Sequence, residues 1–158
     1  MAVSLPLTMS LTKTQIHEYC LQELTNRLQN AREAMAALRE SVAADTKSSM
    51  GDKYETAREM AQQELEKISR QMGMLQQSLG IFNRIQSSLK LTVIGLGALI
   101  ETDKGFFYMA APLGKIVIQN QEIMVISPQS PAGKSMLGKK VGNSFELNGT
   151  VFQILSVA

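Results

Sequence analysis

The chain has 158 residues and a mass of 17.3 kDa, which suits one compact domain or two small ones and is too short for most multidomain enzymes. Hydrophobic residues make up 44% of the sequence and charged residues 19%, so the composition excludes an intrinsically disordered chain. The formal net charge of +2 is too small to indicate a nucleic-acid partner, and we expect weak or no direct DNA binding.

The single cysteine, Cys20, excludes an internal disulfide and a thiol-based zinc cluster, because both need at least two sulfur atoms. The chain opens without a signal sequence, and its longest apolar run, Val93 to Ile100, is too short to cross a bilayer. These features predict a cytoplasmic protein with no membrane partner. His17 lies three residues before Cys20 and could share a metal ion with it, but ordinary packing is the simpler interpretation of this pair.

The first half of the chain carries two series of apolar residues in alternating steps of three and four, the pattern of a helical seam. The first series is Leu21, Leu24, Leu28, Ala31, Met35, Leu38 and Val42. The second series is Tyr54, Ala57, Ala61, Leu65, Ile68, Met72, Leu75, Leu79, Phe82, Ile85 and Leu89. We predict two long helices that pair as an antiparallel coiled coil in a domain of residues 1–90, with the tip at about residues 45–52.

Acidic residues gather at this tip, namely Asp45, Asp52 and Glu55. Asp52 is a good N-cap for the second helix, and Glu55 at the third helical position completes an arrangement that resembles a capping box. Each arm of the hairpin reaches roughly 45 Å, so that the tip is expected to project into solvent. The same carboxylates could therefore enter another protein's active site and share a divalent ion there.

From Leu91 onward the apolar period changes to two, and β-branched and aromatic residues become more frequent. The expected strands cover residues 92–101, 106–111, 115–119, 122–127, 144–147 and 150–157. Asn148-Gly149 is typical of a two-residue hairpin turn, and antiparallel order is expected throughout. Ser130 at an N-cap, Pro131 at the first helical position and Gly138 after Leu137 predict one short helix. The fold class is therefore α+β, with a second domain of residues 91–158.

The sequence supports neither a phosphate-binding loop nor a nucleophile with its own base. Gly133-Lys134-Ser135 looks like the end of a phosphate-binding loop, but Pro128 stands where that loop needs its first glycine. The chain has one histidine, on the predicted arm, and therefore no usable base for a serine or cysteine nucleophile in the sheet half. A self-contained hydrolase is not expected.

The stretch from Ile126 to Asn143, ISPQSPAGKSMLGKKVGN, resembles the signature of the bacterial Gre family of transcript-cleavage factors, and the resemblance spans nearly the whole chain. It implies an N-terminal coiled coil joined to an FKBP-like antiparallel sheet domain with one short helix. It also implies a partner, RNA polymerase, whose secondary channel the coiled coil enters to stimulate cleavage of backtracked RNA. Such a factor is not itself an enzyme and meets the RNA 3′ end only indirectly.

At the tip, Gly51-Asp52-Lys53-Tyr54-Glu55-Thr56-Ala57 is similar to the family's G-D-x-x-E-N-A pattern. On this register the resemblance implies that Asp52 and Glu55 assist catalysis and share Mg²⁺ with the polymerase, with Asp45 as an alternate; the factor has no cofactor of its own. A second register places Lys47 and Met50, which cannot bind metal, at the two acid positions. The resemblance also implies polymerase contacts at Ser130, Pro131, Lys134, Gly138, Lys139 and Lys140.

Two other functions stay open at this point. The altered tip is compatible with a non-cleaving regulator or inhibitor that occupies the same channel. The FKBP-like resemblance suggests a prolyl isomerase or chaperone, although that activity uses a pocket rich in aromatic residues, and the second half offers few of them.

Overall fold

The structure, a computed structural model, describes residues 11–45 and 51–158. These residues form two compact units. The hairpin unit is Gln22–Gly80, and the sheet unit combines residues 11–21 with Ile81–Ala158. Among the described helices, no segment is both long and apolar enough for a membrane span.

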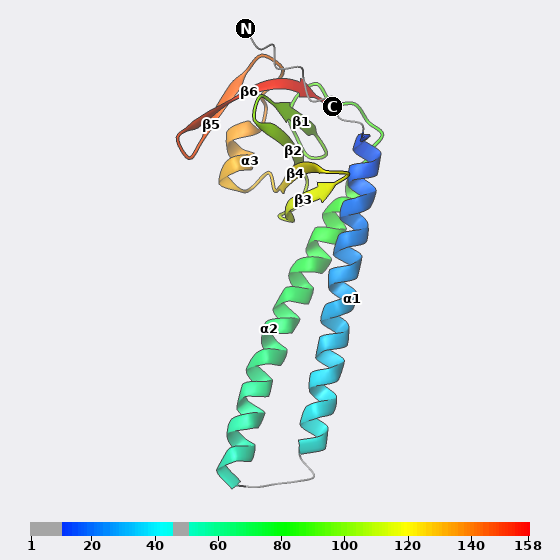
Figure 1. Cartoon of the computed structure of the whole chain (residues 1–158), viewed down its shortest axis with the longest axis vertical. Coiled ribbons are helices and arrows are strands. Elements are labelled where there is room, and N and C mark those ends of the chain that lie inside the picture. Colours follow the sequence, from blue (N-terminus) through cyan, green and yellow to red (C-terminus); the bar gives the residue numbers. More distant parts are fainter. Residues whose placement is uncertain (1–10, 46–50) are drawn as a thin grey trace. The chain divides into compact units, whose positions relative to one another are not determined.

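Two long helices supply the hairpin unit, as the sequence predicts. Helix α1 spans Lys13–Asp45 and helix α2 spans Gly51–Arg84, and within the hairpin unit they run side by side in opposite directions (Figure 1). Leu24, Leu28 and Ile68 are buried along the seam, whereas the polar residues around them are exposed. This pattern confirms the seam, since apolar residues every three to four positions make one continuous stripe on a helix.

The two helix ends near residues 51 and 84 differ from the sequence prediction. Helix α2 begins at Gly51, so Asp52 lies within the first turn and not at the N-cap. At the other end α2 stops at Arg84, although the predicted apolar series runs on to Leu89. The N–H groups of Ile85 and Leu89 donate i→i−3 hydrogen bonds to the carbonyls of Phe82 (3.2 Å) and Gln86 (3.1 Å). These are bonds of turns, which the periodicity alone does not distinguish from those of a helix.

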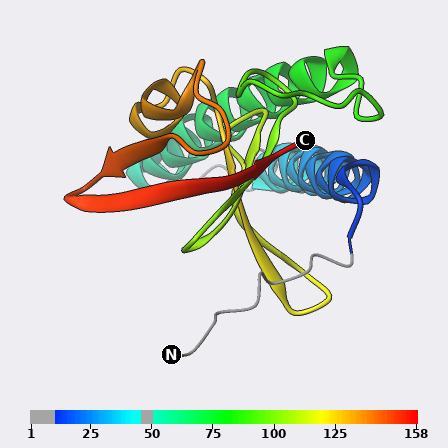
Figure 2. The ribbon, with the colours of Figure 1, turned by 90° about the horizontal axis from the view of Figure 1, so that it is seen from above.

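The sheet unit contains six strands and one short helix. The strands are β1 (Leu99–Thr102), β2 (Gly105–Met109), β3 (Gly114–Ile118), β4 (Gln121–Ile126), β5 (Ser144–Leu147) and β6 (Thr150–Val157). They are ordered β3-β4-β2-β1-β6-β5, and Figure 2 shows β5 and β6 as a long two-stranded ribbon with helix α3 (Pro131–Met136) nearby. The α+β class predicted from the sequence is therefore confirmed.

Local turn and cap signals are confirmed as well. Asn148 and Gly149 adopt φ values of 52° and 80°, the left-handed pair that a two-residue turn between twisted strands requires. Ser130 caps α3, because its hydroxyl oxygen accepts a hydrogen bond from the Gly133 N–H at 3.0 Å. Gly138 follows the helix with a φ of 78°.

Two expectations for the sheet are wrong. Strands β2 and β4 pair in parallel, because β4 returns between β2 and β3 and leaves β3 at the edge; alternation along a strand does not specify its neighbour. Residues 92–98 form no strand beyond one isolated bridge between Val93 and Lys140. Gly97 instead turns the chain with a φ of 89°, and its N–H donates to the Met109 carbonyl at 2.7 Å.

Both faces of β2 are buried, because elements of the sheet unit pack against each of them. Phe107 and Met109 point to one face and pack with Met136 of α3. Phe106 and Tyr108, which alternate with them, point to the other face. There Tyr108 meets the first turns of α1 and the last turn of α2, whose residues belong to the same unit.

Candidate functional site

The tip of the hairpin unit is the end at which α1 stops and α2 starts. Glu55 lies in the second turn of α2 with an exposed side chain. Asp45 is the last residue of α1 and Asp52 is the second residue of α2, but both side chains lie outside the described part of the chain, as does the whole of the 46–50 connection. Positions 52 and 55 are three residues apart on one helix, a spacing that places two side chains on the same face.

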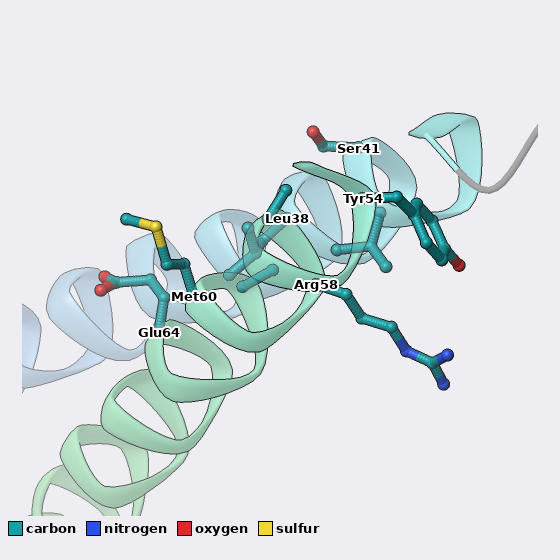
Figure 3. Close-up of a pocket in the computed structure, with 9 residues that line it drawn as sticks. Leu38, Ser41, Tyr54, Arg58, Met60 and Glu64 are labelled. Atoms are coloured by element: carbon teal, nitrogen blue, oxygen red, sulfur yellow. The ribbon is translucent and has the colours of Figure 1, made fainter. Parts of the chain in front are cut away.

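A groove opens between the helices just behind this tip. It has a volume of about 440 Å³, with Leu38, Ser41 and Val42 on the α1 side. On the α2 side, Figure 3 shows Tyr54 and Arg58 toward one end of the groove and Met60 and Glu64 toward the other. The seam is open here, since Leu38 and Val42 are half-exposed whereas Leu24 and Leu28 are buried. Sequence analysis missed the groove because the apolar spacing is the same along both parts of the seam.

Helix α3 and the loop after it hold the residues that the family resemblance marks as polymerase contacts. Lys134 and Lys140 have exposed side chains. Lys139 is half-buried, and its ammonium group donates to the Ser144 carbonyl at 2.7 Å, so that part of its role is to hold β5. Ser130 is used as the N-cap, and Pro131 beside it is exposed. Lys134, Pro131 and Lys140 therefore offer the most accessible side chains of the set.

A buried polar cluster lies on the second face of the sheet. Its members are His17 of α1, Phe82 of α2 and Tyr108 of β2. The His17 Nδ1 atom lies 2.7 Å from the Tyr108 hydroxyl oxygen, and the His17 ring centroid lies 5.2 Å from that of Phe82. Cys20 is buried one turn further along α1. The interpretation of His17 and Cys20 as packing residues matches this burial.

The surroundings of His17 specify its protonation. Burial lowers the pKa of His17, and a hydrogen bond with the Phe82 backbone offsets part of that effect. Burial likewise raises the pKa of the Tyr108 phenol, so the hydroxyl keeps its proton. Neutral imidazole carries one donor and one acceptor, which suits a ring that meets the Tyr108 hydroxyl at Nδ1 and also bonds the Phe82 backbone.

One sequence signal could have found this cluster. Ile16, Cys20, Leu24 and Leu28 follow one another at steps of four, which extends the first seam toward the start of α1. His17 sits beside Ile16 on that stripe, where a polar residue needs a partner. The partner itself, Tyr108, lies 91 residues away and could not be named from the spacing.

Protonating His17 should cost stability. Since its pKa is lowered in the folded state, we expect the free energy of unfolding to be level above pH 6.5 and to fall as the pH drops from there through the folded pKa, by up to about 1.4 kcal/mol per pH unit. NMR titration of this sole histidine and urea unfolding between pH 5 and 7.5 measure the two quantities. The His17→Gln variant should lose the slope, and a pKa above 6.5 in the folded protein would contradict the prediction.

Among the described residues, no three His, Cys, Asp or Glu side chains come together as a group that could hold a metal ion.

The aromatic side chains that a prolyl isomerase pocket would need pack against one another instead. Phe145 and Phe152 stack with ring centroids 5.0 Å apart, and Phe107 meets Phe152 edge-on at 5.7 Å. These rings form part of the core.

The described elements define an α+β protein that joins a two-helix hairpin to a small sheet with one short helix. No protein-family model matches the chain, and a search of curated proteins finds no match. A crystal structure of GreA factor homolog 1 (Gfh1) of Thermus thermophilus is similar, at 23% identity and a TM-score of 0.37, with 87% of this chain and 94% of that chain covered.

A structure of the transcription factor Gfh1 is also similar, at 22% identity and a TM-score of 0.35 over 87% of this chain and 92% of that chain. These structural neighbours are GreA-homologous transcription factors.

Proposed function

We propose that the chain is a Gre-like transcription elongation factor. In this proposal the hairpin enters the secondary channel of RNA polymerase and stimulates the polymerase's own cleavage of backtracked RNA. The observation that carries it is the tip, where the exposed Glu55 follows Asp52 by three residues on α2. Pro131, Lys134 and Lys140 are accessible for contact with the channel rim.

The tip acids are proposed to act together with groups that the polymerase supplies. Two carboxylates on one helix face fit as partial ligands of Mg²⁺, which prefers oxygen and retains several other ligands. When bound, such an ion would supply charge stabilisation for in-line hydrolysis of the RNA. The part of the chain itself is then to hold two carboxylates at the end of a rigid hairpin and to orient a water molecule.

Replacing both acids should separate cleavage from binding. With backtracked polymerase and Mg²⁺, the chain should shorten RNA from its 3′ end faster than polymerase alone, and Asp52→Ala with Glu55→Ala should reduce the rate to that of polymerase alone. A pull-down with polymerase should be unchanged, because the side chain of Glu55 is exposed and position 52 lies in the first turn of α2, at the tip. Glu66→Ala, an exposed acid further along α2, serves as the control and should retain cleavage.

Each other outcome has a defined meaning. Binding without any cleavage by the wild-type chain would favour the non-cleaving channel regulator, which the altered residues Lys53, Tyr54 and Thr56 of the tip suggest. Unchanged cleavage in the double variant would contradict the proposed role of Asp52 and Glu55 and favour Asp45, the alternate acid of the tip. Absence of binding would reject both channel functions.

A further inference from the structure

We propose that a pocket at the end of α2 binds an aliphatic carboxylate of medium chain length, such as a free fatty acid. This Leu89 pocket has a volume of about 210 Å³. Its lining runs from Arg84, the last residue of α2, to Gly97, so that the pocket lies entirely within the sheet unit. The proposal does not rest on the proposed function.

The first reason is the aliphatic lining of the Leu89 pocket. Leu89 and Leu96 line it with side chains that are 53% and 45% exposed, and half-buried Ile85 and Leu91 lie beside them. A Cβ atom added at Gly97 would lie 2.9 Å from the Ile85 Cγ2 atom, so Ile85 packs directly against the backbone there. An alkyl chain on these side chains would remove apolar surface from water, which is favourable.

The second reason is the positive charge beside the pocket. Arg84 lines it with an exposed side chain and belongs to no ion pair among the described residues. The Lys13 ammonium group donates to the Leu89 carbonyl at 2.5 Å, so a second cation lies next to the same wall. The sequence from Ile81 to Ile100 contains no Asp or Glu. A carboxylate at the mouth of the pocket would therefore complement these charges, and a guanidinium group suits a carboxylate in particular.

The third reason is the scarcity of hydrogen-bonding groups in the lining, which favours an alkyl chain over a peptide. Among the described side chains that line the pocket, Gln86 and Arg84 are the polar ones. A peptide would bring backbone N–H and C=O groups that need partners once they are buried, whereas an alkyl chain brings none. The pocket is also smaller than the roughly 300–1,000 Å³ of sites for drug-sized ligands, which suits a short chain.

Titration of the full chain with octanoate tests the proposal, with the methyl signals of Ile and Leu followed by NMR. The dissociation constant should be roughly 1 mM, as expected for a ligand of this size. The signals that move should be those of Ile85, Leu89, Leu91 and Leu96. From hexanoate to octanoate the affinity should rise about two- to fourfold per methylene group, because each one buries further apolar surface.

Two variants separate the contribution of charge from that of apolar contact. Arg84→Gln should raise the dissociation constant of octanoate about fivefold and leave that of octan-1-ol unchanged, because the alcohol makes no ion pair. Leu96→Ala should weaken octanoate and octan-1-ol alike, by about fivefold. Arg70→Gln and Val151→Ala, at exposed positions outside the pocket, are the matched controls and should change neither. Circular dichroism establishes that each variant keeps its fold.

Three results would overturn the proposal. The first is the absence of methyl shifts at about ten times the expected dissociation constant. The second is octan-1-ol binding to the wild type as tightly as octanoate, since the cations would then have no part in recognition. The third is tighter binding of N-acetyl-leucyl-aspartate, which carries an aliphatic group and a carboxylate on a peptide backbone; this would assign the pocket to a protein partner instead.

Discussion

Replacing Gly133 by alanine should lower the free energy of unfolding of the sheet unit by about 3 kcal/mol or more, the largest effect that we expect from adding a single methyl group. A Cβ atom at Gly133 would lie 2.0 Å from the Ser127 carbonyl oxygen and 2.9 Å from the Pro128 Cα atom. Both are backbone atoms, so the clash cannot be relieved by rotating a side chain. Urea unfolding followed by tyrosine fluorescence measures the loss.

Gly80→Ala is the matched control for this prediction. Gly80 lies within α2, and a Cβ atom there meets nothing within 4 Å. The same substitution should therefore raise the stability of the hairpin unit, to which Gly80 belongs, by about 1 kcal/mol, since alanine loses less conformational freedom than glycine in a helix. A Gly133→Ala protein that unfolds within about 0.5 kcal/mol of the wild type would show that the Ser127–Gly133 loop adapts.

Gly133 also shows which features the sequence could predict. Ser130, Pro131 and Gly138 mark the helix through rules that act over a few residues, and the structure agrees with each of them. The requirement for glycine at position 133 arises instead from the carbonyl of Ser127, which the fold bends back over the helix. Rules for helix caps, which act over a few residues, do not predict this contact between Gly133 and the Ser127 carbonyl.

The same distinction holds for the larger architecture. The two helical seams and the strands from residue 105 onward follow from periods of 3.6 and 2, which are properties of single elements. The parallel pairing of β2 with β4 depends on which strand lies beside which, and the residues of β3 would alternate in the same way in either order. The alternation of apolar residues therefore predicted the strands but not their order in the sheet.

The candidate sites divide in a similar way. Residue types and a resemblance suggested the tip acids, and the structure gives Glu55 the exposure that such a role requires. The groove was visible only in the structure, and the sequence could place His17 on a buried stripe but not name its partner Tyr108, which lies 91 residues away. Leu38 and Leu24 have the same place in the heptad pattern, yet one lines an open groove and the other is buried.

Phe82→Ala should destabilise the sheet unit by about 3–5 kcal/mol, the usual cost of removing a fully buried phenylalanine. The Phe82 side chain is completely buried and packs against the rings of both His17 and Tyr108, with centroid distances of 5.2 and 6.2 Å. The cavity would also admit water to His17. We therefore expect a second, independent result, namely a rise in the pKa of His17 toward its ordinary value, because the burial that lowers it is reduced.

Leu89→Ala provides the comparison for this variant. Its side chain is 53% exposed, and its contribution to the sheet unit is through the backbone carbonyl, which accepts a hydrogen bond from the Lys13 ammonium at 2.5 Å. The substitution keeps that carbonyl, so stability should change by about 0.5 kcal/mol or less and the pKa of His17 should stay where it is. If Phe82→Ala lowered stability while leaving the pKa of His17 unchanged, the desolvation of His17 would have to come from Tyr108 and the sheet rather than from α2.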